Sequence, residues 1–258
     1  MIPAAHVTAW SRVAPWPTDE QVEQDLVLAR LIIEIANHSV LGDELVFRGG
    51  TCLHKLVLPE PFRYSEDLDY VRASHGPIGP ILDAIREIAN GLGCRVKTDV
   101  GAFPKASLRG AYESGAGPMR IKIEINTYET SPARQHRRVS YEVDSPWWCG
   151  NAEVLTFQPE ELVATKLRAL YQRKKGRDLF DLWLALTVLD LAPAEIVSCF
   201  DPYRPDGYTA RGARKILNGH LADRGFRNDL GPLLREVPEG YDIDAAGALV
   251  RDSLLGLT

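Results

Sequence analysis

The sequence is poor in the residues that build zinc sites or disulfide frameworks. It has only four cysteines, none of them in a Cys-x-x-Cys pair and none with a histidine at zinc-binding spacing. This scattering is typical of buried or free thiols in a reducing compartment. Apolar runs of bilayer-spanning length are missing, and the first residues lack the charged-then-apolar pattern of a signal peptide. We therefore expect a cytoplasmic protein with no membrane contact.

Two further absences limit the functions that the chain can have. The P-loop pattern Gly-x4-Gly-Lys-Ser/Thr is absent, which excludes a P-loop GTPase or kinase-like site. An excess of basic residues is absent too, because the 258-residue chain has a formal net charge of −5. Any contact with RNA must therefore come from a local basic patch. The remaining composition is that of a globular protein long enough for one large or two small domains.

The most informative stretch of the sequence begins with a short apolar run, Leu45–Phe47, which predicts a buried strand. Gly49, Gly50 and Thr51 follow at once and lead into apolar residues at helical spacing. Because glycine has no Cβ, the backbone amides of such a turn can approach a phosphate group at the start of a helix. The turn therefore predicts a phosphate cradle, although a Gly-Gly pair alone is most often only a tight turn.

Two aspartates follow the turn in an alternating segment. Asp67 and Asp69 share one face of a predicted strand, and Leu68 and Tyr70 share the other. Carboxylates at this spacing project side by side and can share a Mg²⁺ or Mn²⁺ ion. In Mg²⁺ sites, water and phosphate oxygens supply the remaining ligands. A phosphate cradle and a metal platform in one unit are the parts of a phosphoryl-transfer site.

A further acidic residue lies in the segment Met119–Asn126, whose strict alternation predicts a strand. Glu124 shares the polar face of this strand with Arg120 and Lys122, which either hold it through ion pairs or meet phosphate. A solvated polar face explains the same alternation, so the residues alone leave the role of Glu124 open.

Farther along the chain, Pro159 and two acids in the first turn predict a helix that runs to Gln172. Lys166 lies at the edge of its apolar stripe, and Asp178 and Asp181 open the next helix. Between the two helices is a basic turn, which contains Arg173, Lys174, Lys175 and Arg177. Helix-capping aspartates and a solvated turn explain this segment without any function.

Three segments together carry a family resemblance. They read Phe47-Arg48-Gly49-Gly50-Thr51, then Arg63-Tyr64-Ser65-Glu66-Asp67-Leu68-Asp69, then Pro159-Glu160-Glu161-Leu162 with Lys166, Leu170, Arg173 and Arg177-Asp178-Leu179-Phe180-Asp181-Leu182. In this order, within roughly residues 19–190, they resemble the AbiEii/AbiGii toxin family, which includes MenT-like toxins. That family belongs to the nucleotidyltransferase superfamily of the DNA polymerase β type.

The resemblance implies a Mg²⁺- or Mn²⁺-dependent enzyme that transfers a nucleoside monophosphate from a nucleoside triphosphate. It also implies the toxin of a type IV-like or abortive-infection toxin–antitoxin system, with a cognate antitoxin as partner. For MenT-type members the acceptor is the 3′ end of tRNA, which blocks translation. The residues that carry over are Asp67, Asp69, Lys166 and Asp178 as catalytic, Gly49, Gly50, Thr51 and Lys166 as nucleotide-binding, and Asp67, Asp69 and Glu124 as metal ligands. The basic turn is the candidate for RNA contact.

Two other functions remain open on the sequence. The first is transfer to a small molecule or a protein hydroxyl, which suits the acidic net charge slightly better. The second is a non-catalytic nucleotidyltransferase-like module that only binds a partner or a nucleotide. The joint presence of Asp67, Asp69, Lys166 and Asp178 argues against this second function, because a module without activity has no reason to retain all four.

The order of these elements predicts an α/β (α+β) nucleotidyltransferase core with a mixed sheet, followed by a helical C-terminal lobe. We place the N-terminal arm and the core in residues 1–155 and the helical lobe in residues 156–258. Thr18 or Asp19 is expected to cap the first long helix. Asp25 within that helix is interpreted as facing solvent. A packed corner is expected at Trp147-Trp148, before the helix that starts at Pro159.

Overall fold

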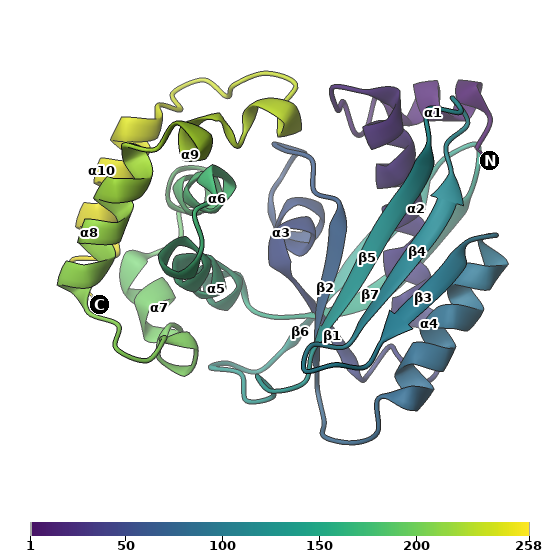
Figure 1. Ribbon diagram of the computed structural model, residues 1–258, viewed down its shortest axis with the longest axis horizontal. Helices are drawn as coiled ribbons and strands as arrows, with labels where there is room; N and C mark the ends of the chain where they lie inside the picture. The colour runs from purple at the N-terminus through teal and green to yellow at the C-terminus, as the bar shows by residue number, and fades with distance from the viewer. Residues whose placement is uncertain (1, 258) are drawn as a thin grey trace. The chain divides into compact units, whose positions relative to one another are not determined.

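A seven-stranded mixed sheet forms the frame of the first part of the chain (Figure 1). The computed structural model describes residues 2–257. Its strands are β1 (Leu45–Arg48), β2 (Asp67–Arg72), β3 (Arg95–Asp99), β4 (Lys105–Ala111), β5 (Pro118–Asn126), β6 (Arg137–Asp144) and β7 (Cys149–Thr156). Their order in the sheet is β3-β4-β5-β2-β1-β7-β6, with β2 parallel to β5 and antiparallel to β1. The sheet and its helices confirm the predicted α/β class.

The chain divides into two compact units. The first contains the sheet and comprises the residues up to Thr130 together with His136–Phe157. The second comprises Ser131–Gln135 and the residues from Gln158 on. The expected domain boundary after residue 155 stays a prediction, because a division into compact units does not test whether each part folds independently. Residues 1 and 258, at the ends of that division, lie outside the described part of the chain.

Helices cover one face of the sheet and leave the other face polar. The first unit contains α1 (Ala4–Trp10), α2 (Asp19–Asn37), α3 (Gly49–Cys52), the π-helical turn η1 (Leu53–Val57) and α4 (Gly79–Gly91). α2 packs against β5 and β7, and α4 packs against β3 and β4. Apolar side chains such as Leu68, Ile121 and Ile123 are fully buried. The alternation of β2 and β5 therefore turns the acidic residues to the opposite face of the sheet.

The start of α2 follows from its capping residues. The Thr18 side chain accepts the backbone N–H of Gln21, and the Gln21 side chain accepts the backbone N–H of Thr18. This reciprocal capping box satisfies two N–H groups that a helix end leaves without partners. The predicted cap at Thr18 is confirmed.

The second unit is helical, as the sequence predicts. Its elements are α5 (Pro159–Gln172), α6 (Gly176–Thr187), α7 (Pro193–Ser198), η2 (Asp201–Tyr203), α8 (Ala210–Leu221), α9 (Arg224–Asn228), η3 (Gly231–Leu233) and α10 (Ile243–Ser253). The fully buried Glu161 accepts the backbone N–H groups of Ala133 and Arg134 and the Tyr203 hydroxyl, at 2.6–3.0 Å. This carboxylate fixes the segment Ser131–Gln135 to the helices of the second unit. Among the described residues, no helix is long and apolar enough to cross a bilayer.

Two elements go beyond the expectations from the sequence. The N-terminal arm contains α1, with Trp10 only 5% exposed. The segment between Trp148 and the helix that starts at Pro159 forms β7. β7 pairs antiparallel with β6 along its length and parallel with β1 at Phe47 and Thr156. It therefore connects the edge strand β6 to the strand that carries the Gly-Gly turn.

Candidate active site

The turn between β1 and α3 packs directly against one of the two predicted aspartates. Gly49 has a φ of +85°, and a Cβ at this residue would lie 2.2 Å from Oδ2 of Asp69. A side chain here would clash with the carboxylate and would require a left-handed conformation that favours glycine. The strand register agrees, because Arg48 lies opposite Asp69. The turn and the aspartate strand are thus adjacent within the first unit.

Gly49→Ala is expected to lower the free energy of unfolding by about 1–3 kcal/mol, because alanine adds left-handed strain to the clash with Asp69. The measurement is urea unfolding. The matched control is Gly219→Ala in α8, where a Cβ would meet no atom within 4 Å. In a helix interior that substitution should stabilise by up to roughly 1 kcal/mol. Equal losses in the two variants would contradict the role of Gly49.

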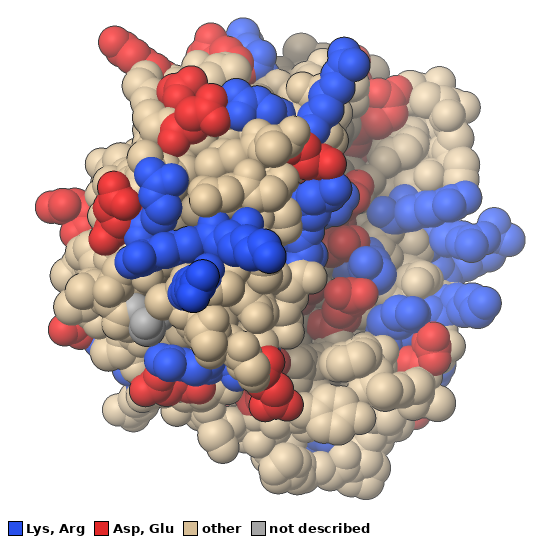
Figure 2. All heavy atoms as spheres, turned by 60° about the vertical axis from the view of Figure 1, so that its left-hand side comes forward, with Lys and Arg blue, Asp and Glu red and all other residues tan. Residues whose placement is uncertain are grey.

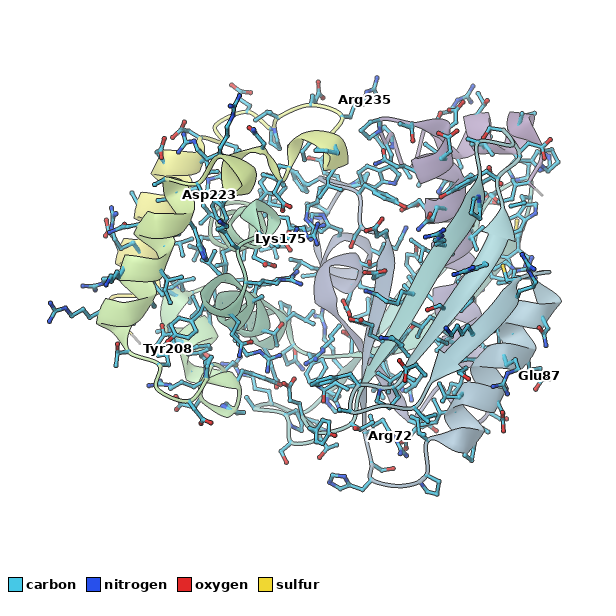
Figure 3. The ribbon with its side chains drawn as sticks, in the orientation of Figure 1. Arg72, Glu87, Lys175, Tyr208, Asp223 and Arg235 are labelled. Carbon is cyan, nitrogen blue, oxygen red and sulfur yellow. The ribbon has the colours of Figure 1, made fainter. Side chains whose placement is uncertain are left out.

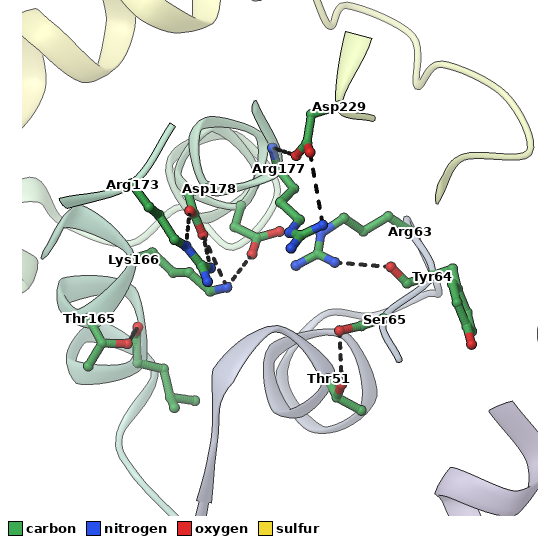
Figure 4. A network of polar contacts seen from close by, with 12 residues as sticks. Thr51, Arg63, Tyr64, Ser65, Thr165, Lys166, Arg173, Arg177, Asp178 and Asp229 are labelled. Atoms are coloured by element: carbon green, nitrogen blue, oxygen red, sulfur yellow. Dashed lines mark hydrogen bonds and ion pairs between the residues drawn. The ribbon is translucent and has the colours of Figure 1, made fainter. Parts of the chain in front are cut away.

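Thr51 connects the turn to the aspartate strand. Its Oγ1 lies 2.5 Å from the carbonyl oxygen of Asp67 and 2.9 Å from the Ser65 hydroxyl (Figure 4). One hydroxyl hydrogen serves only one acceptor, so Thr51 donates to the carbonyl and accepts from Ser65. Thr51 is 2% exposed, which makes this a buried link between α3 and the start of β2. It holds the strand in register with the turn.

Three carboxylates gather on the polar face of β2 and β5. In the parallel pairing, Asp67 lies opposite Lys122 and Asp69 lies opposite Glu124. The Lys122 ammonium is 3.2 Å from both Asp67 and Glu124. Burial would lower the pKa of Lys122, but these two carboxylates raise it above its ordinary value. Partial burial raises the pKa of Asp67 to about 6, against the opposing effect of Lys122.

The donor set of this face fits a hard divalent cation. Asp67 and Asp69 project from the same side of one strand, and Mg²⁺ in proteins commonly uses one or two carboxylates with water and phosphate oxygens. Within residues 2–257, no three His, Cys, Asp or Glu side chains form a ready metal cluster. Of the two sequence alternatives for Lys122, the structure shows the ion pair with Glu124. A metal role for Glu124 stays a prediction.

Asp25 is not on a solvated face, contrary to the sequence interpretation. It is 2% exposed and lies 2.9 Å from both the Lys55 ammonium and Nε1 of Trp10. Burial alone would lower the pKa of Lys55, but Asp25 and then Tyr141 hold it above its ordinary value. Asp25 is three residues after Val22 and four before Ala29, both buried, so the helical period places Asp25 on the buried side of α2.

This ion pair lines a cavity of about 180 Å³ in the first unit. The cavity also borders Thr51 and Ser65, and its aromatic wall includes Trp10, Trp16 and Tyr141. Its volume is below the roughly 300–1,000 Å³ of pockets for drug-sized ligands. We therefore interpret Asp25 and Lys55 as residues that stabilise the fold around the Gly-Gly turn, and not as a ligand-binding pair.

Asp25→Leu is expected to lower the free energy of unfolding by about 3–5 kcal/mol, because it leaves the buried Lys55 ammonium without its carboxylate. The double variant Asp25→Leu/Lys55→Met removes both charges and should recover most of that loss. Chemical unfolding of the three proteins measures both effects. A single variant as stable as the wild type would show that the pair does not support the fold.

Lys166, Arg173, Asp178 and Asp181 form a largely buried charge cluster in the second unit (Figure 4). Lys166 is 5% exposed and lies 2.8 Å from Asp181 and 3.6 Å from Asp178. Both aspartates are fully buried, and Arg173 contacts both oxygens of Asp178 at 2.7 and 2.9 Å. Lys166 is therefore buried beside the apolar stripe of its helix, with its ammonium between carboxylates.

The basic turn is neutralised by aspartates of its own unit. Besides the Arg173–Asp178 pair, the contacts are Lys174–Asp223 at 2.6 Å, Lys175–Asp229 at 3.5 Å and Arg177–Asp229 at 4.0 Å. Lys175 and Asp223 are labelled in Figure 3. These pairings reduce the positive charge that the turn offers to RNA. RNA contact by these four residues stays a prediction.

Comparison with known proteins identifies the family. The family model described as nucleotidyl transferase AbiEii toxin, type IV TA system, matches residues 30–249. No curated protein matches the sequence significantly. Among solved structures, the chain is similar to MenT4, nucleotidyltransferase toxin Rv2826c from Mycobacterium tuberculosis, with a TM-score of 0.62 and 18% identity over 98% of this chain and 87% of that one.

Two structures from Helicobacter pylori are also similar. JHP933 has a TM-score of 0.58 and 17% identity, over 92% of this chain and 90% of that one. A putative nucleotidyltransferase has a TM-score of 0.54 and 17% identity, over 93% of this chain and 99% of that one. At these identities the structural similarity establishes the fold alone, and the family model establishes the family. The chain belongs to the AbiEii family of nucleotidyltransferase toxins of type IV toxin–antitoxin systems, which implies a nucleoside triphosphate substrate and an antitoxin partner.

Proposed function

We propose that this toxin transfers a nucleoside monophosphate from a nucleoside triphosphate to the 3′ end of tRNA, with Mg²⁺ or Mn²⁺ as cofactor. The observation that carries the proposal is the contact between the Gly49 turn and the Asp69 carboxylate. It brings a backbone able to approach phosphate next to a carboxylate able to hold a cation. Nucleotidyltransferases generally use a divalent metal, and the donor set of β2 is chemically suited to one.

In this proposal the residues of the first unit bind and orient the nucleotide. Asp67 and Asp69 would hold the cation, and the amides of Gly49, Gly50 and Thr51 would receive the triphosphate. The metal would supply charge stabilisation at the transferring phosphoryl group. The acceptor hydroxyl forms a new ester bond with the α-phosphorus, and pyrophosphate leaves. Lys122 is held between Asp67 and Glu124 and limits the repulsion between these carboxylates.

Lys166 and Asp178 are the candidate catalytic residues of the second unit. An ammonium near the triphosphate neutralises charge that develops during transfer. Asp181, at 2.8 Å, is the closer of the two carboxylates to Lys166, so it is the better candidate for orienting that ammonium. Asp178 also forms an ion pair with Arg173. This pair would fix the start of α6, where Asp178 lies.

The acceptor is tested by incubating the toxin with Mg²⁺, each α-labelled nucleoside triphosphate in turn, and deacylated bulk tRNA. Label in a tRNA-sized band is expected with the wild type. Periodate-oxidised tRNA, which lacks the 3′-terminal diol, is the matched control and should remain unlabelled. Label in a protein or in a small molecule instead would assign the activity to one of the other acceptor classes. No label in any acceptor would support a binding module without catalysis.

A further inference from the structure

Three arginines lie side by side across three neighbouring strands of the first unit. Arg95 on β3 is paired in register with Arg109 on β4, and Arg109 is paired with Arg120 on β5. All three are exposed. Because adjacent strands are about 4.8 Å apart, this arginine row spans about 10 Å across the sheet. None of its three side chains forms an ion pair with any of the residues from 2 to 257.

The arginine row is expected to destabilise the folded state. Like charges directly opposite each other on neighbouring strands are destabilising. Protection of a sheet edge against aggregation accounts for basic residues on an edge strand such as β3. It does not account for Arg109 or Arg120, because β4 and β5 are interior strands. An external polyanion would remove the repulsion that the fold leaves uncompensated.

The next residues on the same face connect the arginine row to the carboxylates of β2. Lys97 on β3 and Lys122 on β5 flank Ser107 in the following register row. Lys122 lies opposite Asp67. Arg120 precedes Lys122 by two residues, which is about 7 Å along a strand. The row and the candidate metal carboxylates therefore share one continuous face within the first unit.

The charges of the row differ from those of Lys105, of Lys122 and of the basic turn, which are paired. Lys105 pairs with Asp99, Lys122 pairs with Asp67 and Glu124, and every cation of the basic turn has an aspartate partner. In Figure 2, basic side chains stand out over the strands at the right-hand side, next to acidic ones. A net charge of −5 leaves such local groups as the sites for a polyanion.

We propose that the arginine row binds the phosphate backbone of an RNA acceptor and guides its end toward Asp67 and Asp69. This inference rests on the proposed function for the choice of RNA as the polyanion. Arginine forks match phosphate oxygens, and contacts with phosphate position a nucleic acid without reading its sequence. The row therefore gives affinity and direction, with no selection among RNA sequences.

The test compares wild type with the triple variant Arg95→Gln/Arg109→Gln/Arg120→Gln. Binding of deacylated bulk tRNA is measured without nucleotide, from 50 to 200 mM salt. The variant should bind at least about tenfold more weakly at low salt, and its slope of log affinity against log salt should be smaller by about 2. The variant with lysine at the three positions keeps the charges, so it should retain most of the tRNA affinity and most of the salt slope. Thermal melts should show no loss of stability, because the substitution relieves repulsion.

The matched control is Arg211→Gln/Arg214→Gln/Lys215→Gln on the exposed face of α8, which removes the same charge from the second unit. Its tRNA binding should stay within about twofold of wild type. Unchanged tRNA affinity and salt slope in the arginine variant would overturn the proposal. So would loss of binding in the α8 variant alone, or no tRNA binding by the wild type at low salt.

Poly-L-glutamate serves as the probe for an acidic protein partner. If the arginine variant loses poly-L-glutamate binding but keeps tRNA binding, the row is a protein-binding surface and the proposal is wrong. Because binding is measured without nucleotide, it is independent of transfer. Wild-type binding to tRNA through the row, without transfer of any nucleotide, would support the row and refute the proposed function. Transfer to tRNA by the arginine variant with an unchanged KM for tRNA would support the proposed function and refute the role of the row.

Discussion

Asp69→Asn is expected to reduce single-turnover nucleotidyl transfer by about a thousandfold or more and to leave the fold intact. A metal at the transferring phosphoryl group contributes several kcal/mol, and each 1.36 kcal/mol is a factor of about ten in rate. Asparagine has nearly the shape of aspartate, so the close contact with Gly49 should survive. The charge that would hold the cation is lost.

A readout besides activity makes this prediction specific to metal binding. Mg²⁺ should raise the melting temperature of the wild type, because a ligand that binds only the folded state stabilises it. It should not raise that of Asp69→Asn. The matched control is Asp99→Asn on β3, an exposed carboxylate paired with Lys105, which should transfer nucleotide at the wild-type rate. Equal transfer by wild type and Asp69→Asn at saturating Mg²⁺ would refute the role of Asp69.

Lys166→Met is expected to destabilise the protein by about 3–5 kcal/mol, in addition to abolishing transfer. The substitution leaves the buried Asp181 without its closest cation. Chemical unfolding measures the loss. Asp178 should be affected less, since Arg173 still contacts both of its oxygens.

The double variant Lys166→Met/Asp181→Asn separates the structural role of Lys166 from the catalytic one. Removing the Asp181 charge together with the ammonium should restore much of the stability. Transfer should stay reduced by about a hundredfold or more, which is the usual effect of removing a preorganised charge at the reacting group. A double variant that recovers both stability and transfer would show that Lys166 only neutralises Asp181.

The parts of the fold that follow from local rules could be predicted from the sequence. The Gly-Gly turn, the alternating strand of Asp67 and Asp69, and the cap at Thr18 each depend on neighbours within a few residues. β7 was missed because Gly150 and Asn151 are poor strand formers. Its pairing with β1 is between residues far apart in the chain, which no local pattern encodes.

The charged residues of the site were less predictable than its backbone. Asp25, Lys166 and the basic turn all look like solvated groups when only their own helix or turn is considered. Each is instead held by a partner from elsewhere in its unit: Lys55 for Asp25, Asp181 for Lys166 and Asp223 for Lys174. The arginine row needs the strand register of β3, β4 and β5, which alternation in single strands does not give.

The central claim is that the face shared by Gly49, Asp67 and Asp69 is the nucleotidyl-transfer site. Its most direct test is single-turnover transfer from an α-labelled nucleoside triphosphate to deacylated tRNA, with wild type and Asp69→Asn side by side at saturating Mg²⁺. The account predicts labelled tRNA with the wild type and a rate at least about a thousandfold lower with the variant. Labelled tRNA at equal rates in the two proteins would contradict it.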